Sequence, residues 1–412
     1  MKLIKFILLA MLIPSFILAE GGSAYSMIGA GELIHSYSAR RMGMGELGIA
    51  MFDRDFLGAI NPASWAKLNL TRLETAINIQ NIKEEGSSVS SYHSQTSFSG
   101  ALFGVPVEHD LGIAVAGGII PYSRTDYKIA QTINNGSYSY KTVYEGSGSI
   151  SKVFIGSSYT LPFGLNVGAS FDYYIGKSDY YSTISFIGNS ALTNSEFQKV
   201  NKTAGIGGSF GLISNDLSGL TGIAGINNVR LGLTGSFAGG FNSDTTYLIY
   251  NSTGIDTLST GKASSQLPST IGAGLSFIYK DTYLVTLDYL FQPWKDYKSG
   301  GVSDSRLRSL HKISTGVEYR NPDVRAYGFW DRMMYRGGLS YEQTQYIVNG
   351  QGINQLSVYA GISIPIEYEN TLDLAFQYGT RGAVESNLLK ENIFKLNASL
   401  SFGELWFLRT ER

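Results

Sequence analysis

Hydrophobic and polar residues alternate along most of this chain beyond about residue 70. The segment 165–174 places apolar residues at every second position with small or polar residues between them, and the segment 393–402 repeats this pattern. Side chains of a β-strand point alternately to opposite faces, so a period of two predicts strands. Alternation alone fits both a soluble β-sandwich and a membrane barrel, because each has one apolar and one polar face.

The length and number of the alternating segments favour a membrane barrel. Many span 10 to 13 residues, whereas strands of soluble proteins average about 5 or 6 and tilted membrane strands need about 9 to 11. Fourteen strands are predicted, at 71–83, 92–104, 111–122, 149–160, 165–176, 202–213, 229–240, 269–279, 282–293, 309–319, 333–344, 354–364, 371–379 and 393–402. An even number permits antiparallel closure without a free sheet edge. The predicted fold class is therefore all-β, a 14-stranded antiparallel transmembrane β-barrel.

The predicted connections differ between the two ends of the barrel. Short connections follow even-numbered strands, at 161–164, 280–281 and 365–370. Long loops are predicted after odd-numbered strands, at 123–148, 177–201 and 241–268. Two further connections, 214–228 and 320–332, are longer than this rule prefers and are interpreted as small periplasmic excursions. Short turns on one side and long loops on the other are typical of outer-membrane barrels.

The first nineteen residues have the layout of a secretory signal peptide. Lys2 and Lys5 precede an apolar run from Phe6 to Leu18, and cleavage after Ala19 or Ala24 fits the small residues that follow. The run is about 13 residues, shorter than the roughly 20 that a membrane-spanning helix needs. An uncleaved anchor helix is the alternative interpretation. The sequence therefore predicts export to the outer membrane.

The residues between the signal peptide and the first strand suggest a different structure. Residues 20–70 are rich in glycine, contain several charged residues and show only weak periodicity. Fourteen strands enclose a lumen too wide for their own side chains to fill, so we predict an N-terminal luminal plug, or hatch. The predicted organisation is a signal peptide at 1–19, the hatch at 20–70, the barrel at 71–407 and a periplasmic tail at 408–412.

Composition agrees with a barrel and excludes several other classes. Hydrophobic residues make up 43% of the chain and charged residues 16%, against about 25% charged in an average soluble domain. Glycine (49) and tyrosine (27) are abundant, so the composition is too polar for a bundle of membrane helices. Cysteine is absent, which excludes disulfides, thiolate zinc sites and a lipoprotein anchor. The formal net charge of −1 and the absence of a basic stripe argue against nucleic acid as a partner. We expect no cofactor.

Three parts of the sequence resemble the FadL family of outer-membrane transporters. The first is 43–65, in which a glycine-rich run leads to the triplet Asn61, Pro62 and Ala63. The others are 267–277 with Asp288, Tyr289 and Trp294, and the C-terminal pieces 378–382, 391–397 and 402–407. This ending is similar to FadL-like proteins of the Bacteroidetes type. The three parts cover about a fifth of the chain, occur in the right order and span its length.

The resemblance implies a fourteen-stranded barrel with a hatch and a function in uptake. The expected cargo is a long-chain fatty acid or another small hydrophobic compound, which crosses by passive diffusion and leaves sideways through a kinked third strand. In this sequence the candidate gate is Gly117, Gly118 and Pro121, because glycine and proline are where a strand can bulge or lose a ladder bond. Alternatively, Gly117 and Gly118 only relieve crowding against the hatch.

The hatch and the barrel wall supply further candidate ligand contacts. Arg40, Arg41 and Arg54 are candidate contacts for a carboxylate, since guanidinium binds carboxylates in a bidentate way. Pairing with carboxylates of the barrel is the alternative. Leu284 and Leu290 fall on the polar face of the ninth predicted strand, which indicates a partly apolar lumen. Packing against the hatch explains them equally well.

The C-terminus carries a candidate membrane-insertion signal, formed by Phe402, Trp406 and Phe407. The expected partners are accordingly the barrel-assembly machinery, the lipid of the outer membrane and a hydrophobic small-molecule ligand.

Two other functions and one other fold compete with this interpretation. The four histidines, His35, His93, His109 and His311, lie in no metal-binding or triad-like motif, so we predict no enzyme and no metal site. A barrel hydrolase assembled from separate strands stays open, and His311 would be the first residue to test. FadL-like barrels also include PorV-type shuttle proteins of a secretion system, which bind exported proteins. The alternative fold is a pair of soluble, secreted β-sandwiches.

Overall fold

The computed structural model describes residues 22–87, 90–135, 138–188, 194–251, 254–322, 328–366 and 369–405. The predicted signal peptide and the predicted C-terminal tail lie outside these residues. The strands are β1 (Glu32–Leu33), β2 (Thr71–Glu85), β3 (Ser90–Glu108), β4 (Ile113–Asn135), β5 (Tyr138–Thr160), β6 (Asn166–Ile187), β7 (Ser195–Ile213), β8 (Ile226–Ala238), β9 (Gly240–Asn251), β10 (Gly254–Gln266), β11 (Thr270–Tyr279), β12 (Tyr283–Gln292), β13 (Lys298–Ser299), β14 (Val302–Ser303), β15 (Leu310–Tyr319), β16 (Met334–Val348), β17 (Gln351–Pro365), β18 (Thr371–Arg381) and β19 (Lys390–Glu404).

Helical elements are short and lie between the strands. They are η1 (Ala24–Met27), α2 (Ala39–Gly43), η2 (Pro62–Lys67), α3 (Ser218–Thr221), η3 (Trp294–Asp296), η4 (Trp330–Arg332) and η5 (Glu385–Asn387). Among the described residues, no helix has both the length and the apolar character to span a bilayer.

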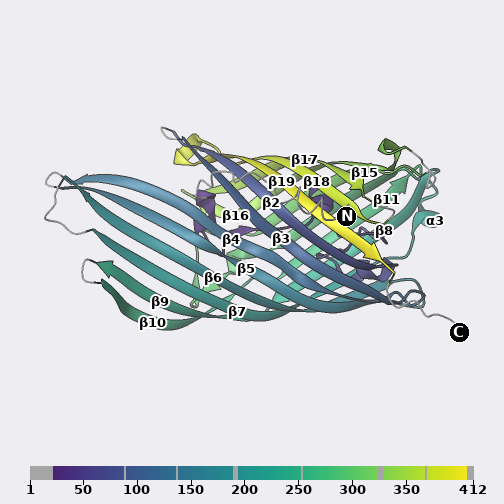
Figure 1. Cartoon of the computed structure of the whole chain (residues 1–412), viewed down its shortest axis with the longest axis horizontal. Coiled ribbons are helices and arrows are strands. Elements are labelled where there is room, and N and C mark those ends of the chain that lie inside the picture. Colours follow the sequence, from purple (N-terminus) through teal and green to yellow (C-terminus); the bar gives the residue numbers. More distant parts are fainter. Residues whose placement is uncertain are drawn as a thin grey trace, which may run out of the picture.

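The strands close into an antiparallel barrel (Figure 1). β7 pairs with β9 through residues 196–204 and with β8 through residues 207–213, so β8 and β9 are two halves of one interrupted strand. β10 and β11 continue each other in the same way, because they pair with β9 and β8. The last strand, β19, pairs with β2 from Glu404↔Thr71 to Lys390↔Glu85 and closes the ring. Counted in this way the barrel has fourteen strands, which confirms the predicted fold class.

The barrel wall is polar inside and apolar outside. On β12, Thr286 and Asp288 are buried, whereas Leu287 and Tyr289 are exposed. The same phase holds on β15, where Lys312 and Glu318 are buried and apolar residues between them are exposed. A soluble sandwich buries its apolar face, so this inverted arrangement excludes the sandwich alternative and indicates a barrel whose outer surface meets lipid.

The regular apolar outer surface occupies one part of the long strands, and exposed apolar residues beyond it, such as Ile187 and Phe197, are scattered. On β6 the exposed apolar residues Phe171, Tyr173 and Ile175 come early, and on β7 the exposed Ile206, Phe210 and Leu212 come late. This apolar belt therefore lies toward the end where the chain enters and leaves the barrel. Strands β4 to β7, β9 and β10 extend beyond the belt on the opposite side (Figure 1). Outer-membrane barrels extend further on their extracellular side, so we assign this projection to the cell exterior.

The predicted long loops at 123–148, 177–201 and 241–268 are wrong. Most of these residues continue the strands as hairpins, and β4 pairs with β5 up to Asn135↔Tyr138. The physical reason is that both faces of a strand meet water beyond the membrane. The hydrophobic alternation then disappears from the sequence, while the backbone ladder continues to satisfy its N–H and C=O groups. β10 shows this clearly, because nearly all of its residues are exposed.

The N-terminal segment, defined as residues 22–70, lies inside the ring of strands. Its helix α2 contacts β16 to β19, while η2 contacts β3 to β7 on the other side of the barrel. Residues such as Leu47, Ile49 and Trp65 are almost completely buried, so the apolar core lies between this segment and the wall. The approach is very close at Gly211, where an added Cβ would stand 1.8 Å from the Asn61 Oδ1. Only glycine fits there.

Candidate functional site

A small cavity in the lumen is the first candidate for a ligand site. It has a volume of about 120 Å³ and lies between the N-terminal segment and the walls formed by β4, β5, β7, β8 and β12. Its apolar lining includes Leu33, Ile34, Ile60, Ile120 and Leu290. The burial of Leu290 beside Thr286 and Asp288 agrees with a partly apolar lumen on this strand. We name this space the lumen cavity.

A second space of about 60 Å³ adjoins the lumen cavity. Residues 33–36 of the N-terminal segment and Pro121 of β4 line both spaces. The second space reaches Phe98 of β3 and Arg124 of β4, so it extends from the lumen to the place where these two strands meet. Its lining is more charged and includes Glu32 and Arg381.

The pairing between β3 and β4 ends part-way along the wall. The described pairs run from Glu108↔Ile113 to Ala101↔Ile119, although both strands continue beyond them. β4 has a bulge between Pro121 and Ser123 in its pairing with β5, and proline has no N–H to donate to a ladder. We define the seam as Ser90–Gly100 of β3 together with Ile120–Asn135 of β4.

The predicted gate residues lie beside this seam. Gly117 and Gly118 pair with Phe103 and Leu102, just before the pairing ends, and Pro121 lies just after it. The atoms nearest to an added Cβ on either glycine belong to neighbouring strands and not to the N-terminal segment, so the alternative of crowding against the hatch gains no support. An added Cβ on Gly118 would stand 2.4 Å from the Ala101 carbonyl oxygen of the neighbouring strand. The lateral-gate role itself stays a prediction.

The N-terminal segment covers the β4 side of the seam. β1 pairs with β4 through Glu32↔Arg124 and Leu33↔Ser123, and the N–H of Ile34 donates to the Tyr122 carbonyl at 3.0 Å. The backbone pairing of β1 with β4 takes the place of the pairing that β3 does not form with β4 beyond Ile119. β1 could not be predicted from the sequence, because a two-residue strand is too short to show a period.

Ser26 adds a further contact between the N-terminal segment and the backbone of β4, at Asp126. Its hydroxyl donates to the Asp126 carbonyl and accepts from the Asp126 N–H, both at 2.9 Å. Side chains also bridge the two sides, since the Arg124 guanidinium donates to the Gln95 amide oxygen at 2.9 Å and Gln95 donates to Asp126.

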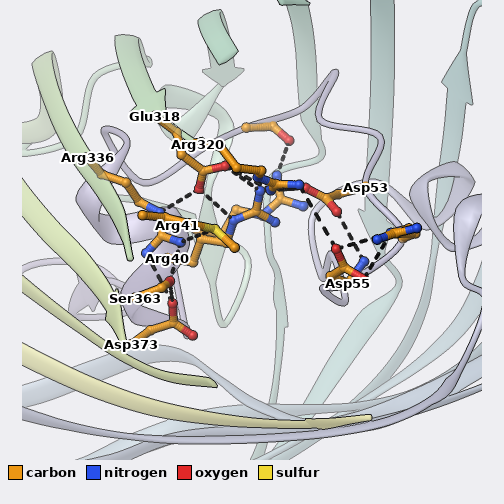
Figure 2. Close-up of polar contacts among 12 residues, drawn as sticks. Arg40, Arg41, Asp53, Asp55, Glu318, Arg320, Arg336, Ser363 and Asp373 are labelled. Atoms are coloured by element: carbon orange, nitrogen blue, oxygen red, sulfur yellow. Dashed lines mark hydrogen bonds and ion pairs between the residues drawn. The ribbon is translucent and has the colours of Figure 1, made fainter. Parts of the chain in front are cut away.

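On the opposite side, buried ion pairs hold the N-terminal segment to the wall (Figure 2). The Arg40 guanidinium lies 2.6 Å from Asp53 and 3.0 Å from Glu318 of β15. Glu318 also accepts from Arg320 at 2.9 Å and from Arg336 at 2.6 Å. Arg336 reaches Asp373 at 3.1 Å. We call these three arginines and three carboxylates the Arg40 cluster; their formal charges cancel.

The three candidate arginines differ sharply in their surroundings. Arg40 is 1% exposed and paired with protein carboxylates, as the pairing alternative expected. Its neighbours Asp53 and Glu318 raise its pKa, although burial acts in the opposite direction. Arg54 has a side chain 60% exposed and lies 3.4 Å from Asp55.

Arg41 is the candidate arginine that lines the lumen cavity. It is 7% exposed, and its guanidinium donates to the Gly48 carbonyl at 2.5 Å. Burial lowers its pKa, and the neighbouring charge of Arg40 acts in the same direction.

Other buried groups of the barrel hold the turn 46–49. Lys312 of β15 forms ion pairs with Glu46 and, at 3.0 Å, with Glu342. Burial disfavours the charged form of Glu46, but the charge of Lys312 outweighs this and lowers its pKa. Asp288 of β12 accepts from the N–H groups of Gly48 and Ile49 at 2.9 and 2.8 Å.

The residues of the Asn61, Pro62 and Ala63 triplet begin η2. The side-chain oxygen Oδ1 of Asn61 accepts from the Ala63 N–H at 3.1 Å, and Pro62 occupies the first helical position. The Asn61 amide group donates to Ile49 at 2.8 Å and to the wall carbonyls of Leu212 and Leu233 at 3.2 Å. The triplet therefore fastens the N-terminal segment to β7 and β8.

Of the predicted insertion signal, the structure describes Phe402 only. It lies on β19 and pairs with Leu73 of β2, whereas Trp406 and Phe407 lie outside the described residues.

The histidines form no metal site among the described residues. Ser91, His93 and Glu84 do meet near the seam, with the Ser91 hydroxyl 3.1 Å and the Glu84 carboxylate 3.5 Å from the same Nε2 of His93. A catalytic triad instead uses the two ring nitrogens for the nucleophile and the carboxylate separately. His311 contacts the Tyr289 hydroxyl through Nδ1 at 2.8 Å, and His35 lies 3.2 Å from Glu342. His109 lies in the turn between β3 and β4.

Sequence reasoning missed the barrel partners of the N-terminal segment, above all Asp288, Lys312, Glu318 and Arg336. A signal was present, because these charged residues occupy the polar phase of strands whose other phase is apolar. A charge on the inward phase of a membrane strand needs a partner in the lumen. Their partners on the N-terminal segment could not be assigned without the fold.

A closed barrel with an apolar belt and a polar interior defines the class of outer-membrane β-barrels. The chain belongs to the BamG family, whose family model matches residues 1–411.

Among solved structures the chain is similar to FadL-type barrels. The Ralstonia pickettii toluene transporter TbuX has a TM-score of 0.60 at 16% identity, over 89% of this chain and 98% of that one. The Pseudomonas putida toluene transporter TodX has a TM-score of 0.57 at 17% identity, over 91% and 99% of the two chains. A Pseudomonas aeruginosa FadL homologue has a TM-score of 0.57 at 13% identity, over 90% and 99%. These similarities show the fold, and they confirm the resemblance to FadL-like proteins. No curated protein matches the sequence.

Proposed function

We propose that this protein lets small hydrophobic compounds cross the outer membrane by passive diffusion. The carrying observation is that the apolar lumen cavity adjoins β4 where its pairing with β3 ends. Residues 33–36, Glu46 and Pro121 line both this cavity and the second space that reaches the seam. The seam is then the lateral exit, with Gly117, Gly118 and Pro121 beside it.

The size of the cavity bears on the cargo. A dry cavity of about 150 Å³ in another protein binds benzene, so about 120 Å³ suits a single ring or a short alkyl segment. Each methylene that leaves water contributes roughly 0.8 kcal/mol. A long-chain fatty acid would have to extend into the second space, which is charged. This supports small aromatic cargo, and two of the similar structures are described as toluene transporters.

The N-terminal segment acts in this proposal as the hatch, which closes the lumen to ions and water. Its contacts with opposite walls and the Arg40 cluster support this role. If the cargo bears a carboxylate, Arg41 is the candidate arginine placed to bind it, since it lines the lumen cavity and is not held by a close ion pair among the described residues. Export by the segment 1–19 completes the proposal.

The seam can be tested by tying its two sides together. Cysteines at Gln95 and Asp126, whose side chains are hydrogen-bonded across the seam, can be bridged by a short thiol-specific cross-linker that a reducing agent removes. The chain has no cysteine of its own. We expect cross-linking to slow toluene entry severalfold in cells whose outer membrane lacks other such channels and which contain a toluene-oxidising enzyme. Reduction should restore the rate.

The matched control bridges two strands whose pairing is continuous. Asp179 and Val200 pair across β6 and β7, and the strand register places Asp179 level with Asp126. Bridging cysteines there should leave entry unchanged. Toluene consumption that does not depend on expression of the protein would refute transport. Dependence on the protein without an effect of the Gln95–Asp126 bridge would retain transport but reject the lateral exit.

A second candidate function is that of a scaffold in an assembly at the outer membrane. The family name BamG hints at the barrel-assembly machinery, and a PorV-type shuttle is a related possibility. Two observations favour it. The cavities near the seam are small, and buried ion pairs hold the N-terminal segment to the barrel wall. This function can be tested by cross-linking in cells followed by purification. Stoichiometric recovery of barrel-assembly components, together with toluene consumption that does not depend on the protein, would favour the scaffold.

A further inference from the structure

The largest described cavity of the molecule is not in the apolar lumen. It has a volume of about 570 Å³ and lies under the inner faces of β4 to β7, β9 and β10 and beside residues 27–30. On β6 its lining residues, Ser178 and Tyr180, follow the apolar belt at Phe171 to Ile175. The cavity therefore lies in the projection outside the membrane, and we name it the outer vestibule.

Aromatic side chains separate the outer vestibule from the lumen cavity. Tyr122 lines the lumen cavity and Phe241 lines the vestibule. Tyr174 lies between them, with ring centroids 5.4 Å from both. The lining residues of the two spaces do not overlap. The vestibule is therefore a separate site and not the mouth of the proposed hydrophobic route alone.

Hydroxyl groups dominate the lining of the outer vestibule. Six serines, three threonines and four tyrosines are among its lining residues. Thr245 donates to the Asn201 amide oxygen at 2.9 Å, and the hydroxyls of Thr203 and Ser243 are 3.2 Å apart. A hydroxyl both donates and accepts hydrogen bonds, so it suits a ligand that does the same.

Fixed charge is sparse and largely compensated in the vestibule. Asp304 and Arg306 form an ion pair at 2.8 Å. The Lys199 ammonium lies 5.8 Å from the ring centroids of both Tyr180 and Tyr247. An ionic ligand would find little countercharge here, and an apolar ligand would strip water from hydroxyls that it could not replace.

We propose that the outer vestibule is a binding site for a neutral saccharide. Sugar hydroxyls match the serine, threonine and asparagine groups, while the apolar face of a pyranose ring packs against tyrosine rings such as Tyr180 and Tyr247. The volume falls within the range of about 300–1,000 Å³ that is usual for small-molecule sites. A saccharide can reach the vestibule from two sources, a free oligosaccharide or the sugar portion of lipopolysaccharide.

The test is saturation-transfer NMR on the full mature chain in detergent micelles. One arm uses neutral oligosaccharides as probes, namely maltotriose, cellotriose and mannotriose. The other arm uses the neutral outer polysaccharide of lipopolysaccharide from the same cells, separated from its charged inner sugars. We expect transfer to ring protons in at least one arm, and the arm that responds identifies the source.

Variants then locate the bound sugar. Tyr247→Ala and Tyr180→Ala each remove one ring, and we expect about three- to tenfold weaker binding because one aromatic contact is lost. Tyr173→Ala is the matched control, since Tyr173 is 40% exposed on the outer face of β6 and Tyr247 is 41% exposed. Heat-modifiable migration on gels verifies that each variant is folded.

Three outcomes overturn the proposal. One is the absence of transfer for every probe at millimolar concentration. Another is binding that both tyrosine variants leave unchanged. The third is a co-purifying protein that protects vestibule residues from labelling while no sugar binds, which would assign the surface to a protein partner. None of these outcomes bears on toluene entry, so this proposal and the proposed transport fail separately.

Discussion

The N-terminal segment is attached to the barrel in two very different ways. Toward β15, β16 and β18 it is held by the Arg40 cluster, in which Glu318 is fully buried and contacts three arginines. Toward β4 it is held by two backbone pairs of β1 and by the hydroxyl of Ser26. The first attachment consists of groups whose loss leaves buried charge behind, whereas the second consists of ordinary hydrogen bonds.

This difference separates a strong contact of the segment from a weak one. Residues 22–36 are also held to other strands, through the ion pairs of Glu32 with Arg381 of β18 and Lys395 of β19. Breaking a buried ion pair costs about 3–5 kcal/mol, while a hydrogen bond contributes about 0.5–1.5 kcal/mol. The weak attachment is the one that covers the seam. A change that releases residues 22–36 from β4 would therefore leave residues 38–50 in place.

The largest effect is expected for Glu318→Gln. The change leaves Arg40, Arg320 and Arg336 without their shared carboxylate, so the free energy of unfolding should fall by about 3–5 kcal/mol. Urea unfolding of the detergent-solubilised barrel measures it. The control is Glu145→Gln, which removes the exposed ion pair with Lys128 and should cost about 0–1 kcal/mol. Equal effects of the two variants would show that Glu318 stabilises the barrel no more than an exposed ion pair does.

A smaller, local effect is expected for Gly31→Val. Gly31 has a φ of +91°, and an added Cβ would stand 2.3 Å from the Arg124 carbonyl oxygen. Strain of about 1–3 kcal/mol should then release β1 from β4. Hydrogen exchange of residues 22–36 should become roughly tenfold faster or more, with residues 38–50 unchanged.

Gly350→Val is the control for Gly31→Val, because Gly350 has a φ of +76° and no atom near its added Cβ. Faster exchange of the whole N-terminal segment in the Gly31 variant would mean that the two attachments open together.

The smallest effect is expected from acid. Burial raises the pKa of Glu32, but Arg381 and Lys395 outweigh it and lower the pKa from its ordinary 4.5 to about 2. Since the folded-state pKa is depressed, the stabilisation is complete above about pH 4.5 and is lost as the pH falls toward 2. Protection of residues 30–36 against exchange, corrected for the intrinsic rate, should be lower at pH 3 than at pH 6.

Glu32→Gln removes the titrating group behind this acid effect. The variant should show reduced protection at both pH values and little difference between them. If its protection falls with acid as much as that of the wild type, another group controls the attachment. Glu46 is such a group, since Lys312 lowers its pKa against the opposing effect of burial.

The barrel could be predicted because its pattern is local. On β6, a period of two across Phe171, Asp172 and Tyr173 gives both the strand and the orientation of its faces. The same logic failed at 123–148, where both faces are wet and the alternation ends although the strands continue. That Arg40, Arg41 and Arg54 bind a carboxylate of the cargo stays a prediction. Their roles were not predictable, since Arg40 and Arg41 are neighbours in sequence but have different partners.

The order of residues along the chain is sufficient to predict a closed barrel with an outward apolar surface, because each strand carries its own polarity in consecutive residues. The pairing of inward charges with the N-terminal segment, such as Glu318 with Arg40, 278 residues apart, depends on the folded barrel. So do the end of the β3–β4 pairing at Ile119 and the position of β1 beside β4. Those features depend on distances between residues far apart in the chain, which closure of the ring fixes and no local pattern encodes.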